Sequence, residues 1–436
     1  MAPREESSLL SSKHFDIRQS SFGAEVGFAA RCRTKLGCSA LFTTAAALIM
    51  GLAVVSKHHR NAQIQPTGPY ELVECQEGQA FFDAYDFYDG ADSLGSAGYN
   101  FYVSEKRAKQ LDILNVTRDK KDGQEYVYMS SAPTTEGPRE SIRLEGKKRY
   151  DRGLFILDAH HMPAGPGVWP AWWLTDEDFW PDHGEIDVLE GINNQTSAKT
   201  ALHTSAQCSM YAHVPSWSKT GTWDRATGIP DTYSGLPNFN TSKEADDCWN
   251  MAAHQWGNQG CVAIDDKEGS IGAPFNENGG GVYVLEWDPI NRYIKSWSFG
   301  RDHVPANLQD SMRSASGGGK DRVTPDPSTW GMPYAYFAIG EGTGCSADHF
   351  QSMHIVFNLA FCGNVAGNRF FKDCEEEAKH FNVSNDPIKS CNAYIKSDPK
   401  VLDEAYWKIS GVYVYERALE KMTKNAASVS DASGTE

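Results

Sequence analysis

Three acids in one short stretch are the residues of this chain with the clearest chemical potential. Glu185, Asp187 and Glu190 are separated only by isoleucine, valine and leucine. A surface strand alternates polar with apolar residues and does not place an apolar pair between acids. In a regular strand Glu185 and Asp187 share one face, while Glu190 lies on the other. One extra residue in a bulge brings all three acids to one face. The spacing therefore predicts a bulge at Val188-Leu189.

Three acids on one face fit the cleavage of glycosidic bonds. A retaining glycosidase uses one ionised carboxylate as nucleophile and one protonated carboxyl as acid, about 5–5.5 Å apart. A third acid between them can separate the two roles by adjusting the proton affinities of its neighbours. The alternatives are a calcium site and a solvated acidic strand. Calcium ligands come more often from loops rich in Asp and Asn, with Gly at the turn, so we favour the catalytic interpretation.

The elements that must position these acids are short strands. Stretches of β-branched and aromatic residues recur between clusters of Gly, Pro, Asn and Asp, and long helical periodicity is scarce. This pattern indicates an antiparallel β-sandwich rather than βαβ units. We expect one all-β domain over residues 70–419, with a long segment 205–281 of the kind that is functional or pinned by disulfides. The clearest strand candidates are 125–129, 153–157, 281–287, 293–299, 354–358 and 411–415.

The composition is compatible with an uncharged polysaccharide as partner. A formal net charge of −16 argues against nucleic acid, because phosphate binding needs clustered Lys and Arg. It argues equally against an anionic polymer. The chain has 12 Trp, 18 Tyr and 20 Phe, whose flat faces suit the apolar C–H faces of sugar rings, although aromatic residues serve as core just as often. Hydrophobic residues make up 40% of the chain, which is enough for a packed core.

An apolar run near the N-terminus predicts a membrane anchor. Residues 36–55 carry no charge and are long enough to cross a ~30 Å hydrocarbon layer as a helix. The polar segment 1–35 is too long for the leader of a typical signal peptide, so we expect an uncleaved signal anchor, with a cleaved leader as the alternative. Residues 1–35 are expected to be disordered and cytoplasmic, 56–69 to form a stalk, and 420–436 a disordered tail.

This orientation predicts a single-pass type II membrane protein whose folded domain is lumenal or extracellular, on the plasma-membrane and cell-wall side. Eight of the ten cysteines follow the apolar run, and an even number in such a segment indicates disulfides, although the sequence does not choose the pairing. None has the CxxC spacing of a zinc site. Glycosylation acceptor patterns begin at Asn115, Asn194, Asn240 and Asn382. A glycan on Asn194 would lie close to Glu190.

The sequence around the three acids resembles glycoside hydrolase family 16, in its fungal endo-1,3(4)-β-glucanase (laminarinase) branch. Residues 184–191 resemble the E-x-D-x-x-E strand of that family, and 167–174, 202–205 and 361–363 fit in order. The similarity spans residues 70–419. The resemblance implies a concanavalin-like β-jelly-roll sandwich with a concave substrate cleft. It also implies hydrolysis of β-1,3 or mixed β-1,3/1,4 glucan by double displacement, with retention of the anomeric configuration.

The resemblance assigns the three acids to separate tasks. Glu185 matches the nucleophile, Glu190 the general acid/base and Asp187 the supporting acid. Two features depart from the family. Members of this branch are usually secreted, so the anchor moves the expected role toward the cell's own wall. Residues 205–281 are longer than the family core requires, which leaves the exact linkage preference open.

The resemblance further implies three substrate-binding residues. Trp173 and Trp180 match positions that stack on or line sugar subsites, with core packing as the alternative for each. His203 matches a histidine beside the catalytic face, with a purely structural histidine as the alternative. We expect no cofactor, since the sequence has neither a phosphate-cradling Gly loop after a strand nor an HExxH motif. A structural calcium ion and the oligomeric state are left open.

Three activities fit these residues. The first is a hydrolase of β-glucan. The second is a cell-wall glucan transglycosylase, in which a sugar hydroxyl rather than water captures the intermediate on Glu185. The third is a catalytically silent glucan-binding protein, which is disfavoured because a binder needs neither a nucleophile nor an acid.

Overall fold

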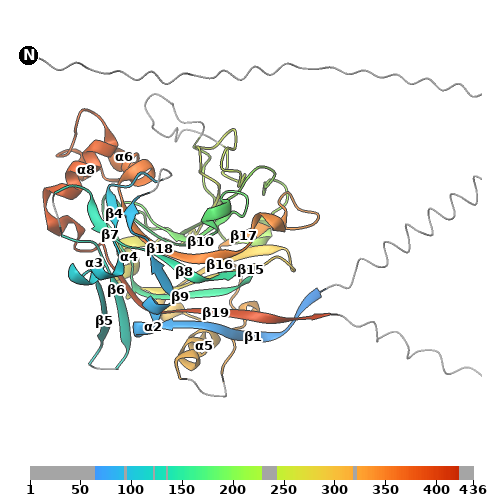
Figure 1. Cartoon of the computed structure of the whole chain (residues 1–436). Helices are drawn as coiled ribbons and strands as arrows, with labels where there is room; N and C mark the ends of the chain where they lie inside the picture. Colours follow the sequence, from blue (N-terminus) through green and yellow to red (C-terminus); the bar gives the residue numbers. More distant parts are fainter. Residues whose placement is uncertain are drawn as a thin grey trace, which may run out of the picture. The chain divides into compact units, whose positions relative to one another are not determined.

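The protein is described by a computed structural model that covers residues 64–92, 96–120, 123–133, 136–227, 243–317 and 322–421. Within these residues two large antiparallel sheets lie face to face, which confirms the predicted all-β sandwich (Figure 1). A small third sheet contains β3 (Gly90–Ala91), β4 (Asn100–Tyr102) and β7 (Arg139–Ser141).

The first large sheet, sheet A, has the strand order β17-β16-β15-β9-β19-β6-β5, and β1 pairs with β19 beside this path. The six stretches expected to be strands all lie in β strands, five of them in this sheet. Its strands are β1 (Ile64–Glu77), β5 (Leu114–Arg118), β6 (Glu125–Met129), β9 (Gly153–His161), β15 (Gly281–Asp288), β16 (Tyr293–Gly300), β17 (Ala335–Ala338) and β19 (Trp407–Lys421).

The second large sheet, sheet B, has the order β13-β14-β12-β11-β10-β18-β8-β2. The three acids lie on β11, near the middle of this sheet. Its strands are β2 (Tyr85–Phe87), β8 (Arg143–Tyr150), β10 (Val168–Thr175), β11 (Glu185–Glu190), β12 (Lys199–His203), β13 (Thr222–Trp223), β14 (Cys261–Ile264) and β18 (Met353–Phe361).

The main hydrophobic core fills the space between the two sheets. Sheet A contributes side chains such as Phe155 and Leu285, and sheet B contributes Trp172, Leu174 and Phe357 to the same buried cluster. Because successive side chains of a strand point to opposite faces, the residues between these on sheet B lie on its outer face, turned away from sheet A. That outer face holds the candidate site.

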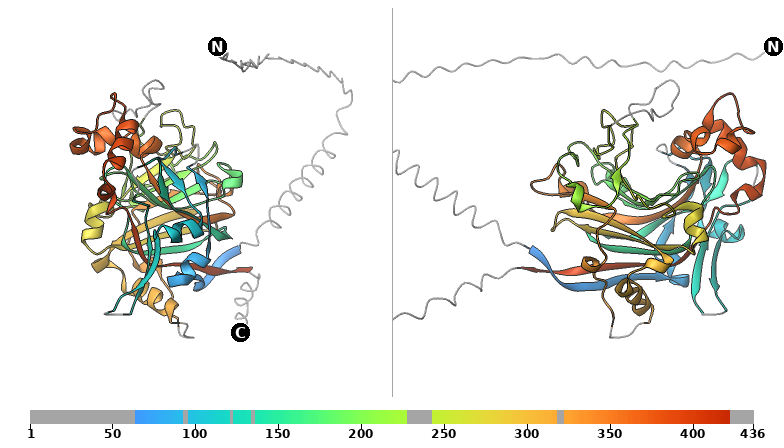
Figure 2. Two further views of the ribbon diagram at one scale, coloured as in Figure 1. Left: turned by 60° about the vertical axis from the view of Figure 1, so that its left-hand side comes forward. Right: turned by 180° about the vertical axis from the view of Figure 1, so that it is seen from behind.

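Helices and loops cover the edges and the back of the sandwich. α5 (Ala306–Ser316) packs Leu308 and Met312 against the outer side of sheet A. The α6–α8 segment and the segment after β12 stand on opposite sides of the outer face of sheet B, as both views in Figure 2 show. The remaining helices are α2 (Gly78–Asp83), α3 (Glu105–Gln110), α4 (Gly272–Glu277), α6 (Phe370–Asp373), α7 (Glu375–Ala378) and α8 (Pro387–Ser397).

Two sequence-based boundaries need correction. The domain was expected to begin at residue 70 after a stalk, but β1 begins at Ile64 and pairs Ile64 with Lys421 of β19. The last part of the expected stalk and the first part of the expected tail are therefore strand, since each satisfies the backbone hydrogen bonds of the other. The long segment 205–281 also contributes to the sandwich, because Cys261–Ile264 forms β14 within sheet B.

The disulfides explain how the long segment is held. Cys208 pairs with Cys345, and Cys248 with Cys261, so both pin this segment to the sandwich. A third disulfide joins Cys362 to Cys391, while Cys75 and Cys374 are free. No helix among the described residues is long and apolar enough to cross a bilayer. The predicted anchor at 36–55 lies outside the described residues and stays a prediction.

Candidate active site

A β-bulge on β11 brings the three acids to one face. Trp172 of β10 pairs with Leu189 and Trp173 pairs with Asp187, which leaves Val188 as the extra residue. The predicted bulge at Val188-Leu189 is thus confirmed. Its consequence is visible in the packing, because the apolar residues of β11, including both Val188 and Leu189, belong to the core between the sheets. The alternation of side chains then places Glu185, Asp187 and Glu190 on the outer face.

Asp187 is held by His203 from the neighbouring strand. Their Oδ2 and Nε2 atoms are 2.9 Å apart, and both residues are buried, at 4% and 6% exposure. The pairing of β11 with β12 sets this contact, since Glu185 lies opposite His203 in the register. Gly260 packs against the far side of the ring, where a Cβ would lie 2.8 Å from Nδ1. His203 therefore lies beside the three acids with its ring bonded to Asp187, and its part in substrate binding stays a prediction.

The pKa values of Asp187, Glu190 and His203 are all raised above those of the isolated side chains. Burial disfavours the charged form of His203, but the charge of Glu185, the hydrogen bond with Asp187 and the charges of Asp187 and Glu190 outweigh it and raise its pKa to about 9. Burial and the charge of Glu185 raise the pKa of Asp187. Burial is also the main cause of the raised pKa of Glu190. A raised carboxyl pKa is what a general acid needs near neutral pH.

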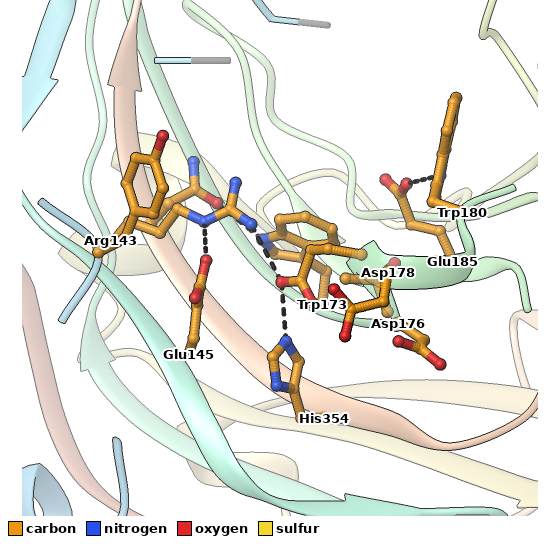
Figure 3. Close-up of polar contacts among 12 residues, drawn as sticks. Arg143, Glu145, Trp173, Asp176, Asp178, Trp180, Glu185 and His354 are labelled. Atoms are coloured by element: carbon orange, nitrogen blue, oxygen red, sulfur yellow. Dashed lines mark hydrogen bonds and ion pairs between the residues drawn. The ribbon is translucent and has the colours of Figure 1, made fainter. Parts of the chain in front are cut away.

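Each of the two glutamates accepts a hydrogen bond from a tryptophan. The indole Nε1 of Trp180 donates to Oε2 of Glu185 at 2.7 Å, as Figure 3 shows. The indole Nε1 of Trp169 donates to Oε1 of Glu190, also at 2.7 Å. Trp180 is 38% exposed, which excludes the core-packing alternative for it. The contact from Trp169 favours the ionised form of Glu190, against the effect of burial.

Trp173 lies beside the acids and belongs to a polar assembly on the same face. Its Nε1 donates to Oδ1 of Asn358 at 2.8 Å, and the guanidinium of Arg143 lies 5.2 Å from its ring centroid. Arg143 donates to Glu145 at 2.8 Å and to Glu177 at 3.1 Å (Figure 3). The charge of Arg143 is thus balanced by two carboxylates. Trp173 is partly buried. Asn358 of β18 bonds its indole nitrogen and Arg143 of β8 lies near its ring, so these two strands fix the orientation of the indole.

The donor set of the site is a poor match for calcium. Glu185, Asp187 and His203 offer ligand atoms within 4.8 Å of one another. However, the raised pKa of His203, to about 9, makes its ring cationic at neutral pH against the charges of the nearby acids. Calcium requires six to eight oxygen ligands, and this group includes an imidazole. We therefore derive no step through a metal.

The acceptor asparagines are accessible where they are described. Asn115, Asn194 and Asn382 are exposed, and Asn240 lies outside the described residues. The side-chain amide of Asn194 donates to the carbonyl of Asp373 at 3.3 Å, and a glycan on this nitrogen would replace that contact.

Sequence reasoning missed three residues of this face: Trp169, Arg143 and Asn358. Trp169 had a usable signal, because Trp169 and Trp173 are four apart on one strand and so share a face. Arg143 and Asn358 had none, since they reach the site from β8 and β18, and Asn358 is separated from Trp173 by 185 residues.

A β-sandwich that presents three acids from one bulged strand has the architecture of a glycoside hydrolase. The family model for an XgeA-like catalytic domain of glycoside hydrolase family 16 matches residues 85–415. The chain therefore belongs to glycoside hydrolase family 16, as the resemblance predicted.

Three curated fungal relatives support this assignment. A probable endo-1,3(4)-beta-glucanase of Aspergillus fumigatus is 33% identical over 368 residues, or 84% of this chain and 48% of the relative. The endo-1,3(4)-beta-glucanase xgeA of Emericella nidulans is 32% identical over 351 residues, or 80% and 47%. A probable glycosidase of Schizosaccharomyces pombe is 30% identical over 348 residues, or 80% and 69%. The chain spans about half the length of the first two relatives.

Two solved structures resemble the fold. Laminarinase 16A from Phanerochaete chrysosporium, with two beta-glucans in its donor and acceptor sites, gives a TM-score of 0.62 at 30% identity and covers 80% of this chain and 100% of that one. An elongating family 16 beta-1,3-glucosyltransferase gives a TM-score of 0.62 at 29% identity and covers 79% and 99%. The first supports the jelly-roll form of the sandwich.

Proposed function

We propose that this chain is a retaining endo-β-glucanase that hydrolyses β-1,3 or mixed β-1,3/1,4 glucan by double displacement. The observation that carries the proposal is the convergence of Glu185, Asp187 and Glu190 on one face of sheet B through the bulge at Val188. The family membership and the glucans bound in the similar laminarinase support the substrate class.

In the first step a carboxylate oxygen of Glu185 attacks the anomeric carbon of the donor sugar. The bond from that carbon to the glycosidic oxygen breaks, and Glu190 transfers its proton to the departing oxygen. Burial raises the pKa of Glu190 and so keeps this proton available. The hydrogen bond from Trp180 holds the carboxyl group of Glu185 in place for this attack.

In the second step Glu190, now a carboxylate, removes a proton from water. The resulting nucleophile attacks the anomeric carbon, the ester bond to Glu185 breaks, and Glu185 leaves as a carboxylate. Two inversions give net retention. Asp187 and His203 stay in place as a buried pair at 2.9 Å, so we assign them to orienting and balancing charge beside Glu185.

The surroundings favour a neutral sugar. The guanidinium of Arg143 lies 5.2 Å from the ring centroid of Trp173, and its ion pairs with Glu145 and Glu177 leave it no surplus positive charge for an anionic sugar. Trp173 and Trp180 provide aromatic surface on either side of β11 for the apolar faces of glucose units. We assign both to substrate binding.

Transglycosylation on the same residues is the second candidate. The similarity to an elongating beta-1,3-glucosyltransferase supports this candidate. A sugar hydroxyl could capture the same intermediate on Glu185 in place of water. A silent glucan-binding role is disfavoured, since neither Glu185 nor Glu190 forms an ion pair among the described residues that would tie it up.

For the location we propose a type II membrane protein anchored by residues 36–55, with the catalytic domain lumenal or extracellular, toward the plasma membrane and the cell wall. Three disulfides support an oxidising compartment. The exposure of Asn115, Asn194 and Asn382 is compatible with glycosylation there.

The test uses the full chain in detergent with laminarin, lichenan, cellulose and xylan, and resolves the products by size. We expect shorter oligosaccharides from laminarin or lichenan, lost in Glu185→Gln and in Glu190→Gln. Products longer than the oligosaccharide substrate would show that the chain is a transglycosylase rather than a hydrolase. Binding without any product, unchanged in both variants, would overturn both candidates and leave a glucan-binding protein.

A further inference from the structure

Trp169 is a buried residue with a polar contact to the proposed acid/base. Its Nε1 donates to Oε1 of Glu190 at 2.7 Å, and the residue is only 8% exposed. The ring belongs to a small cluster on the outer side of sheet B, with Ile192, Ala360 and Ala366 buried beside it. The indole therefore has little room to turn, and its N–H direction is fixed.

The backbone around Glu190 fixes the same arrangement. Ala171 pairs with Glu190 in the register of β10 and β11. The N–H of Gly191 donates to the carbonyl of Pro170 at 3.1 Å, and that of Asn193 donates to Val168 at 3.0 Å. The chain that follows Glu190 is thus bonded to the residues on both sides of Trp169. The distance between the indole of Trp169 and the carboxyl of Glu190 is therefore set by the pairing of β10 with β11, and not only by the rotamers of the two side chains.

The fold does not require every buried indole N–H to have a hydrogen-bond partner. Among the described residues, the buried tryptophans Trp172, Trp287 and Trp407 leave their Nε1 atoms without a hydrogen-bond partner. The sandwich therefore tolerates unpaired indoles in its interior. The buried tryptophans Trp297 and Trp330 do donate, to Gly331 and Asn307, so what distinguishes Trp169 is its acceptor, one of the two proposed catalytic glutamates.

An indole N–H is a donor only. While it donates to Oε1 of Glu190, the carboxyl proton is favoured on Oε2, because the unprotonated carbonyl oxygen is the better acceptor of a hydrogen bond. We propose that Trp169 is a positioning residue that selects Oε2 of Glu190 as the oxygen that gives and takes the proton, and keeps it turned toward the glycosidic bond. The inference rests on the proposed function, since it assigns a task within that mechanism.

The same contact serves both steps. In the first step Oε2 gives its proton to the departing oxygen, and the charge that develops on the carboxylate is stabilised by the indole N–H. In the second step the same Oε2 takes a proton from water, while Oε1 stays bonded to Trp169. The hydrogen bond lowers the pKa of Glu190 against the upward effect of burial, so that the group can both lose and regain its proton.

The experiment compares Trp169→Phe with Trp172→Phe on laminarin. Trp172 is the matched control, because it lies on the same strand, is fully buried, points into the core and has no partner for its Nε1. Both changes remove an indole and leave a phenyl ring, but only the first removes a donor to Glu190. Rates are measured as a function of pH, below the melting temperature of each variant.

For Trp169→Phe we expect kcat to fall about 10-fold, with KM changed less. The limb of kcat/KM at high pH, where the acid loses its proton, should move up by about one pH unit, because the donor that favours the carboxylate is gone. Trp172→Phe should keep the wild-type pH limb. An unmoved limb in Trp169→Phe, or the same shift in both variants, would overturn the inference. An inactive wild type would instead overturn the proposed function.

A second measurement does not need the Trp169 variant to fold. In the wild type labelled with ¹⁵N-tryptophan, one indole N–H resonance should shift as Glu190 titrates, and this shift should disappear in Glu190→Gln. If no indole resonance loses its titration in Glu190→Gln, the contact is absent in solution and the inference is wrong, whether or not the enzyme is active.

Discussion

Oδ2 of Asp187 lies 2.9 Å from Nε2 of His203, and the two side chains are only 5% and 8% exposed. Asp187 lies on β11 between the two glutamates that we assign to nucleophile and acid/base, and His203 lies on β12 opposite Glu185. A buried contact between an acid and an imidazole stabilises the protonated ring, and the charges of Glu185 and Glu190 add to that effect.

The first prediction concerns the proton on His203. Its pKa is raised to about 9, mainly through Glu185 and Asp187 acting against burial. In Asp187→Asn the pKa of His203 should fall, because both the hydrogen bond to an anion and one negative charge are lost. The measurement is an NMR titration of the imidazole. Asp187→Glu, which restores the charge, serves as control, and an unchanged titration in Asp187→Asn would contradict this account of the pair.

The second prediction concerns stability against pH. Since the pKa of His203 rises from 6.5 to about 9 on folding, its contribution to stability is fully present below pH 6.5 and is lost as the pH rises through about 9. The free energy of unfolding of the wild type, compared with that of His203→Gln, should decrease by roughly 3 kcal/mol across this window. Urea unfolding at several pH values measures it. A difference that grows with pH would have the wrong sign.

The third prediction separates the roles of the two glutamates. Both Glu185→Ala and Glu190→Ala should lower kcat by about 10³-fold or more. With an aryl β-glucoside oligomer that carries a good leaving group, added azide should restore turnover in both variants. Glu185→Ala should form the α-azide, since azide replaces the nucleophile directly, and Glu190→Ala the β-azide, since azide attacks the intermediate on Glu185. A β-azide from Glu185→Ala and an α-azide from Glu190→Ala would show that the nucleophile is Glu190 and the acid/base is Glu185.

The fourth prediction concerns the disulfides. Cys208 and Cys345 are 137 positions apart, whereas Cys248 and Cys261 are 13 apart. In the chain-entropy description a longer closed loop gives more stabilisation, so replacing the first pair by serine should cost about 2 kcal/mol more than replacing the second. Urea unfolding of the two double variants tests this, with Cys75→Ser as a control for an unpaired cysteine. Equal losses would show that loop length does not govern the effect.

Much of the fold follows from local sequence pattern. The six expected strands are strands because their β-branched and aromatic residues fit a pleated surface. The bulge at Val188 follows from the spacing of Glu185, Asp187 and Glu190, since only an extra residue reconciles three acids on one face with Val188 and Leu189 in the core. These are properties of neighbours in sequence, which is why they could be predicted.

The rest of the site depends on which strands lie side by side. Arg143 reaches Trp173 from β8 across β18, and no pattern near either residue identifies the other. The hydrogen bond of Trp169 to Glu190 requires the register of β10 against β11. The pairing of β1 with β19 likewise turned the end of an expected stalk into strand. Each of these contacts is non-local, so the sequence alone did not contain it in a readable form.

In the proposed mechanism Glu185 forms a covalent glycosyl intermediate on the outer face of sheet B. The most direct measurement is to incubate the full chain with a 2-deoxy-2-fluoro-β-laminaribiosyl fluoride, digest it, and locate the added mass by peptide mass spectrometry. The account predicts one disaccharide attached to Glu185, and none in Glu185→Gln. A label on another residue, or hydrolysis of laminarin that releases the α-anomer first without any label, would contradict it.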